Sequence, residues 1–257
     1  MSLSFGHIET HVKFNDESVE EKTQQFIKML NQKKVDTSDV HFEDVMANDP
    51  KPVRIHKGLI NEAATREILT RYGIAHKKSS KKQDTEEKID FFIDDLRLSV
   101  QYKGRNINKN SLKNDLGVEY CRIKNNNGLS VELGRDRHSI ADVYICMDTQ
   151  TRTWHVVPNK IIDQGCRAIH DNFVITVSLK SMTFTGPNGS ITTRDIKKIN
   201  AKKKSTGEIF YGRDGVMIKD NNIGEIRYFT PKKEEEGMYK SICYFNAKFT
   251  ENYEFKL

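Results

Sequence analysis

The sequence predicts an α/β fold with a central mixed sheet, followed by a β-rich region. Three observations lead to this expectation. Apolar residues recur at helical spacing early in the chain, residues 89–103 read as two strands with one continuous apolar face, and short β-like runs separated by Gly, Asn and Pro fill the chain after residue 172. We expect three consecutive parts: an N-terminal helical segment at 1–50, a core at 51–168 and a β-rich C-terminal appendage at 169–257.

Two helices are expected before the alternating segment. The first covers residues 19–33, where apolar side chains lie three and four positions apart. Two prolines at residues 49–52 then break the chain. The second helix covers residues 58–72, with Gly73 at its C-cap position.

The alternating segment predicts a β-hairpin with two distinct faces. If Asp94 and Asp95 form a two-residue turn, the antiparallel register pairs apolar residues only. The expected pairs are Ile93 with Leu96, Phe91 with Leu98, and Ile89 with Val100. The other face then carries Asp90, Phe92, Ser99, Gln101 and Lys103. A shift of one residue would move Asp90 to the apolar face, so the register and the polar face support each other.

The polar face of this hairpin combines residue types that suit metal-dependent phosphodiester hydrolysis. The expected register puts Asp90 across from Ser99 and diagonal to Gln101, at roughly 7 to 8 Å. One cation can bridge side chains at that separation, and magnesium prefers carboxylate and carbonyl oxygens. Lys103 is suited to a place near the scissile phosphate or the attacking water. The alternative is an ordinary amphipathic hairpin whose polar face is solvated.

Basic residues flank the hairpin on both sides. The preceding loop contains Lys77, Lys78, Ser79, Ser80, Lys81 and Lys82, and Arg105 follows the second strand. We expect them to bind DNA phosphates, which would give salt-dependent affinity. A solvated linker is the alternative for the loop lysines.

Composition limits the class of protein. The chain has 257 residues, a formal net charge of +6 and 36% hydrophobic content, without an apolar run of membrane-spanning length or a signal-peptide core. The four cysteines form no CxxC pair, which argues against a structural zinc site or disulfide framework. No phosphate-cradling loop or dinucleotide-binding motif is present. We therefore expect a cytoplasmic protein with no membrane partner and no organic cofactor.

These residues resemble a known family. Glu62 lies on a helix that ends at Tyr72-Gly73, Asp90 follows on a strand, and Gln101-Tyr102-Lys103 follows on the next strand. This order of residues is similar to that of the PD-(D/E)xK nuclease superfamily, and most of all to that of its archaeal Holliday-junction resolvases. The resemblance covers roughly residues 55–165. It implies that residues 51–168 form a three-layer α/β/α core of the restriction-endonuclease type.

The resemblance also implies roles for individual residues. Glu62, Asp90 and Gln101 would hold Mg²⁺, with Mn²⁺ as a substitute, the Tyr102 backbone carbonyl would be a further ligand, and Lys103 would be the catalytic lysine. A solvated helix acid is the alternative for Glu62, since Glu67 lies nearer the middle of the apolar stripe.

Two departures from the family pattern stand at this site. No proline precedes Asp90, and Gln101 replaces the usual acid, a change for which Asp94 could compensate. The expected function is a magnesium-dependent DNA endonuclease of the restriction, branched-DNA or repair type, as a homodimer if it cuts duplexes. The alternatives are a catalytically weakened nuclease fold that acts as a nucleic-acid-binding module, and a structural or protein-interaction protein.

Overall fold

The computed structural model describes most of the chain, and its contacts divide the chain into two compact units. The described residues are 2–10, 18–46, 49–104, 106–107, 116–125, 129–149, 151–185, 189, 191–211, 215–229 and 238–257. The first unit contains residues 1–10, 118–137 and 165–244, and the second contains 11–117, 138–164 and 245–257. These units do not coincide with the three consecutive segments expected from the sequence, because each is assembled from separate stretches of chain.

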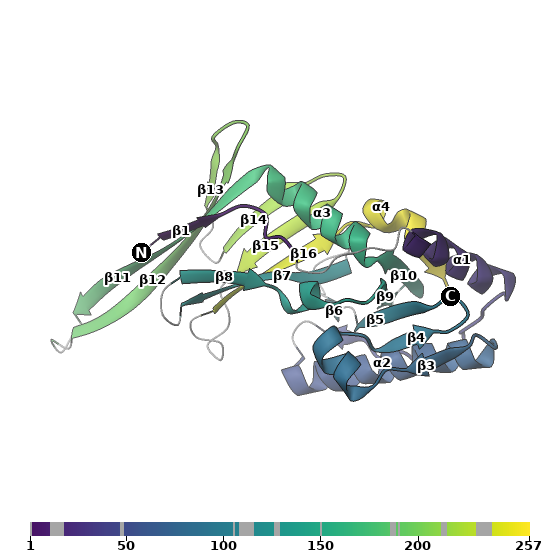
Figure 1. The fold of residues 1–257 in the computed structure, drawn as a ribbon. Helices are drawn as coiled ribbons and strands as arrows, with labels where there is room; N and C mark the ends of the chain where they lie inside the picture. Colours follow the sequence, from purple (N-terminus) through teal and green to yellow (C-terminus); the bar gives the residue numbers. More distant parts are fainter. Residues whose placement is uncertain are drawn as a thin grey trace. The chain divides into compact units, whose positions relative to one another are not determined.

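The second unit is built on a mixed six-stranded sheet (Figure 1). Its strands, in spatial order, are β17 (Glu254–Lys256), β10 (Thr153–Pro158), β9 (Val143–Asp148), β5 (Leu98–Gly104), β4 (Phe91–Ile93) and β3 (His76–Lys78). β5 and β9 are parallel, and the other neighbours are antiparallel. A short parallel pair, β2 (Val45–Met46) with β6 (Asn106–Ile107), also belongs to this unit. The expected mixed sheet is therefore present.

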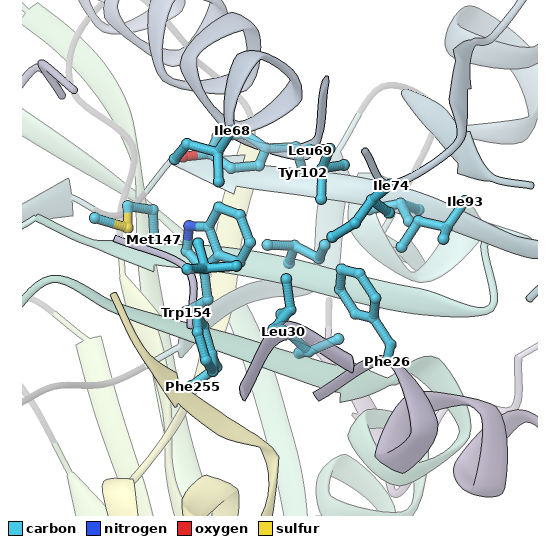
Figure 2. Packing of buried hydrophobic residues seen from close by; sticks show 14 of the residues in the cluster. Phe26, Leu30, Ile68, Leu69, Ile74, Ile93, Tyr102, Met147, Trp154 and Phe255 are labelled. Carbon is cyan, nitrogen blue, oxygen red and sulfur yellow. The ribbon is translucent and has the colours of Figure 1, made fainter. Parts of the chain in front are cut away.

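Helices α1 (Ser18–Gln32) and α2 (Lys51–Arg71) share one hydrophobic core with this sheet. Figure 2 shows Phe26 and Leu30 from α1 and Ile68 and Leu69 from α2 in the same hydrophobic cluster as Trp154. The sheet residues in this core alternate along β4, β5, β9 and β10, as expected for one buried face of a sheet. The remaining short elements of the unit are the π-helix η1 (Gln83–Glu87), α4 (Ala247–Thr250) and the 3-10 turn η4 (Glu251–Tyr253).

The bounds of α2 differ from the expectation at one end only. The helix begins at Lys51, seven residues before Gly58, because Pro50 is the N-cap and Pro52 lies in the first turn, where a proline removes no helical hydrogen bond. At the other end Gly73 has a φ of +62°. The Gly73 N–H donates to Thr70 at 3.0 Å and the Ile74 N–H to Leu69 at 2.8 Å. This is a Schellman ending, which confirms that the helix stops at Gly73.

The β4–β5 hairpin has a longer turn than expected. Phe91 pairs with Val100 and Ile93 with Leu98, so the turn contains the four residues 94–97. The expected two-residue turn at Asp94 and Asp95 is therefore wrong. Arg97 adopts a φ of +52°, which allows this four-residue turn to close. Since the register is shifted by two, every side chain keeps the face that the sequence predicted.

The first unit is rich in strands, as expected for the C-terminal region. One sheet has the order β1 (Ser2–Phe5), β11 (Phe173–Thr185), β12 (Ile191–Lys203), β13 (Ile209–Tyr211). The other has the order β14 (Gly215–Asp220), β15 (Gly224–Phe229), β16 (Met238–Phe245), β7 (Leu116–Asn125), β8 (Leu129–Leu133). The 3-10 turn η2 (Arg135–His138) and the part of α3 (Asn159–Asp171) from residue 165 complete the unit.

Two further expectations can be compared with the structure. All four cysteines are free and buried, which agrees with the absence of a disulfide framework. Among the described helices, none combines the length and apolar character needed to cross a membrane.

Candidate functional site

The Asp90 carboxylate is positioned by backbone groups on both sides of it. Its own N–H donates to Val100 O at 2.8 Å, and its carbonyl accepts from the Ser79 N–H at 3.1 Å. The Tyr102 N–H donates to Asp90 Oδ2 at 2.5 Å. These contacts hold the carboxylate against β5, and the β4–β5 register continues to place Asp90 beside Gln101. The expected position across from Ser99 is wrong, because Ser99 pairs with Phe92.

The electrostatic surroundings of Asp90 disfavour its ionised form. Burial raises its pKa to about 7, against the opposing effect of the Tyr102 N–H. The carboxylates of Glu62 and Asp84 raise the pKa further, whereas the Lys103 ammonium lowers it. The Asp90 carboxyl therefore interacts electrostatically with two other acids and one lysine. A bound cation would favour its ionised form.

Gln101 contributes a buried amide on the same strand face as Lys103. Gln101 is only 6% exposed, and it pairs with Tyr144 of the neighbouring strand β9. Its Oε1 atom accepts no hydrogen bond from the described residues. A buried acceptor without a donor is costly, so this oxygen is available to a water or a cation.

Lys103 follows two residues later on β5, beside Cys146 of β9. Its side chain is half-buried. Strand alternation places it on the face of Gln101, while the Tyr102 side chain points to the opposite face and into the core with α2.

Glu62 is a buried acid of α2 and not a solvated one. It is 9% exposed, and its Oε1 atom lies 3.3 Å from Arg66 Nε. Burial raises its pKa, and the charges of Arg66 and Lys78 oppose that shift. Glu67, which the helical stripe favoured, is exposed and pairs with Arg71 at 3.0 Å. The solvated alternative for Glu62 is therefore wrong.

Asp84 is a site residue that the sequence reasoning missed. It lies in η1, within the segment expected to be an exposed loop, yet its charge raises the pKa of both Asp90 and Glu62. One local pattern in the sequence indicated that a helical turn begins before Asp84, namely Ser80 followed three residues later by Gln83. In the structure these two residues cap each other: Ser80 N donates to Gln83 Oε1 at 3.0 Å, and Gln83 N donates to Ser80 Oγ at 3.3 Å. A Ser-x-x-Gln pattern indicates a helical start.

The basic residues near the hairpin have different surroundings. Lys77 lies in β3, with its Nζ 5.4 Å from the centre of the Phe92 ring and 3.7 Å from Asp94. Asp94 is thus paired with Lys77 and not among the acids that shift the pKa of Asp90. Lys78, which acts on Glu62, is exposed.

The remaining residues of the predicted DNA-binding set stand in the sequence just before η1 or directly after β5. Lys81 and Lys82 are exposed at the start of η1, Ser80 serves its cap and Ser79 is half-buried. Arg105, expected to bind DNA, lies outside the described residues.

The donor atoms at this site fit a hard cation that retains water. In the described part of the chain, no three His, Cys, Asp or Glu side chains form a ready metal-binding group. The set at hand is Asp90 and Glu62 with the amide oxygen of Gln101. Magnesium is commonly held by one or two carboxylates, with waters and substrate phosphates as its other ligands. The unpartnered Gln101 Oε1 is the observation that favours a cation here.

Comparison with protein-family models, with curated proteins and with solved structures finds no match to this chain.

Proposed function

We propose that this protein is a magnesium-dependent DNA endonuclease. The observation that carries the proposal is the set around Asp90: a half-buried residue whose carboxyl has a pKa of about 7, two acids and a lysine that shift this pKa, and the unpartnered Gln101 oxygen next to it. Like charges are costly in such a place unless a cation joins them.

Each residue has a defined part in this proposal. Asp90, Glu62, Gln101 and the Tyr102 carbonyl would hold Mg²⁺, and when bound the ion supplies charge neutralisation at the phosphate and acidity to its water. The Tyr102 N–H fixes the orientation of Asp90. Lys103 carries its ammonium beside the same carboxyl, where it can donate to a phosphate oxygen or orient the attacking water.

The proposal includes the restriction-endonuclease type of core. Support comes from the order α2, β3, β4, β5 and β9, in which a helix precedes an antiparallel three-strand meander and β9 then joins β5 in parallel. A three-layer arrangement and a dimer for duplex cutting belong to the proposal as well.

The test is cleavage of DNA by wild type and Asp90→Asn. Supercoiled, linear, branched and single-stranded DNA are incubated with each protein in magnesium and in manganese. We expect wild type to cut at least one substrate and Asp90→Asn to cut none. Asp95→Asn is the matched control, because Asp95 is an exposed acid of the hairpin turn, and it should cut like wild type. Equal activity of wild type and Asp90→Asn on every substrate would rule out the endonuclease.

A nucleic-acid-binding module with a weakened nuclease core is the second candidate function. Two observations favour it: Gln101 stands where the family has an acid, and no three-residue acidic, His or Cys metal group lies in the described part. It predicts salt-dependent DNA binding without cleavage in either metal. Cleavage that is lost in Asp90→Asn would eliminate it.

A further inference from the structure

The four-stranded sheet of the first unit has one buried apolar face and one polar face. Phe173, Ile175, Val177, Ile199 and Ala201 are buried on the first. The opposite face also carries the apolar residues Val174 and Ile209; its polar residues, here called the outer face, are Thr176, Ser178, Lys198, Asn200, Lys202 and Tyr211. In the ladder Thr176 pairs with Asn200, Ser178 with Lys198, and Asn200 with Tyr211, so these residues share one side of the sheet.

The charge on the outer face has one sign. Lys198 and Lys202 are exposed, and neither makes an ion pair with the residues that the structure describes. Lys202 lies four positions after Lys198 along the strand, or about 13 Å away at roughly 3.3 Å per residue. None of the six residues is acidic, whereas an ordinary solvated sheet face mixes both signs. The face is therefore complementary to a polyanion.

Hydrogen-bonding groups and an aromatic ring accompany the two lysines. The edge strand β1 adds a hydroxyl row, in which Ser4 Oγ lies 2.9 Å from Thr176 Oγ1 and Ser2 Oγ lies 3.3 Å from Ser178 Oγ. At the other edge, Tyr211 is 75% exposed. A large aromatic side chain on a polar sheet face offers a stacking surface for a base, and hydroxyl and amide groups can bond base edges.

We propose that the outer face binds a single-stranded nucleic acid, with Lys198 and Lys202 at its phosphates and Tyr211 stacked on a base. An exposed aromatic ring on a sheet face favours a single strand, because unpaired bases can stack on it, whereas a duplex presents its backbone and grooves. The inference deepens the proposed function by naming a surface that holds the substrate. It rests on that function only for its biological role, since binding needs no cleavage.

Binding is measured by fluorescence anisotropy with a labelled oligothymidylate of about 20 nucleotides, longer than the sites that single-strand-binding domains usually cover. EDTA is present throughout, and wild type is compared with Tyr211→Ala and with the double variant Lys198→Ala/Lys202→Ala. The double variant should lower the slope of log affinity against log salt by about 1.4, or about 0.7 for each lost phosphate contact. Tyr211→Ala should weaken binding at least about fivefold without changing that slope.

The matched control is Lys160→Ala/Lys219→Ala, which removes the same charge from two exposed positions outside the four-stranded sheet, one in α3 and one in β14. It should bind like wild type. Wild-type binding by both outer-face variants would overturn the proposal, as would equal losses in the control or duplex binding as tight as single-strand binding. Asp90→Asn keeps the outer face, so it should bind the oligonucleotide normally whether or not the protein is a nuclease. Circular dichroism verifies that each variant is folded.

Discussion

Two sheets of this protein carry a row of polar side chains on one face, and the two rows differ in their access to water. In β5 of the second unit, Ser99 and Gln101 are buried. In β12 of the first unit, Lys198 and Lys202 are exposed. Strand alternation produced both rows, so alternation alone does not distinguish a reactive face from a solvated one.

Burial decides which polar groups must find a hydrogen-bond partner within the protein. Ser99 is satisfied, because its N–H and Oγ both lie 2.7 Å from Asp142 Oδ2. Gln101 Oε1 has no such partner in the described part, and nearby Asp90 has a raised pKa. Water can satisfy every group of the exposed row. The buried row is therefore suited to chemistry and the exposed row to binding.

The largest expected effect is the loss of Lys103 from the buried row. Lys103→Met keeps the length of the side chain but removes its charge, and cleavage in magnesium should fall by about 10²- to 10⁴-fold. The rate of nicking of supercoiled DNA measures the effect. Lys198→Met, in the exposed row, should leave cleavage at saturating DNA within about threefold of wild type. Equal losses in both variants would mean that charge, and not position, matters.

The next effect concerns the pH dependence of stability. Burial and neighbouring acids raise the folded pKa of Asp90 from 3.8 to about 7. Between these values the folded state binds more protons at Asp90 than the unfolded state, so the contribution of Asp90 to stability is fully present below pH 4 and is lost as the pH rises toward 7. The contribution is on the order of 4 kcal/mol, from about three pKa units at 1.36 kcal/mol each.

Urea unfolding without divalent ions, followed by the fluorescence of Trp154, measures this dependence in the second unit, since the chain has one tryptophan and it is buried there. The difference between wild type and Asp90→Asn should grow as the pH rises from 4 to 7. Asp95→Asn serves as the control and should follow wild type. A constant difference between wild type and Asp90→Asn would mean that Asp90 is ionised in the folded protein at low pH.

The third prediction concerns the apolar face of the β4–β5 hairpin, which lies opposite Ser99 and Gln101 and holds them in place. Leu98 is fully buried opposite Ile93, and Leu98→Ala should cost about 3 kcal/mol of unfolding free energy, because it leaves a cavity beneath the hairpin. Ile191→Ala, at an exposed position of β12, should cost less than about 0.5 kcal/mol. Urea denaturation of both variants provides the comparison. A loss below about 1 kcal/mol at Leu98 would contradict its role in fixing the face.

The sequence predicted the faces of the hairpin better than its register. Six apolar residues in alternation identify the core side, but nothing local determines whether the turn has two or four residues. Arg97, with its positive φ, closes the longer turn, although Arg is not a residue type that signals such a conformation. An error of two residues preserved the site, whereas an error of one would have removed it.

Other features were beyond sequence reasoning because they depend on contacts between distant segments. Glu62 is buried by packing of α2, and the helical stripe favoured Glu67 instead. Asp84 acts on Asp90 only because η1 folds back toward β4. The absence of a partner for Gln101 Oε1 is likewise a property of the folded sheet.

The smallest expected effect is also the sharpest test of the two rows. Gln101→Glu introduces the acid of the nuclease pattern that the sequence resembles, and greater ligand charge should lower the half-saturating magnesium concentration for cleavage on the order of tenfold. Asn200→Asp makes the same kind of change on the outer face. It should leave the magnesium dependence unchanged and weaken oligonucleotide binding, since the new charge repels phosphate. If Gln101→Glu folds normally but magnesium dependence is unchanged, the orphaned amide is not a ligand, and Asp90 and Glu62 must hold the ion without it.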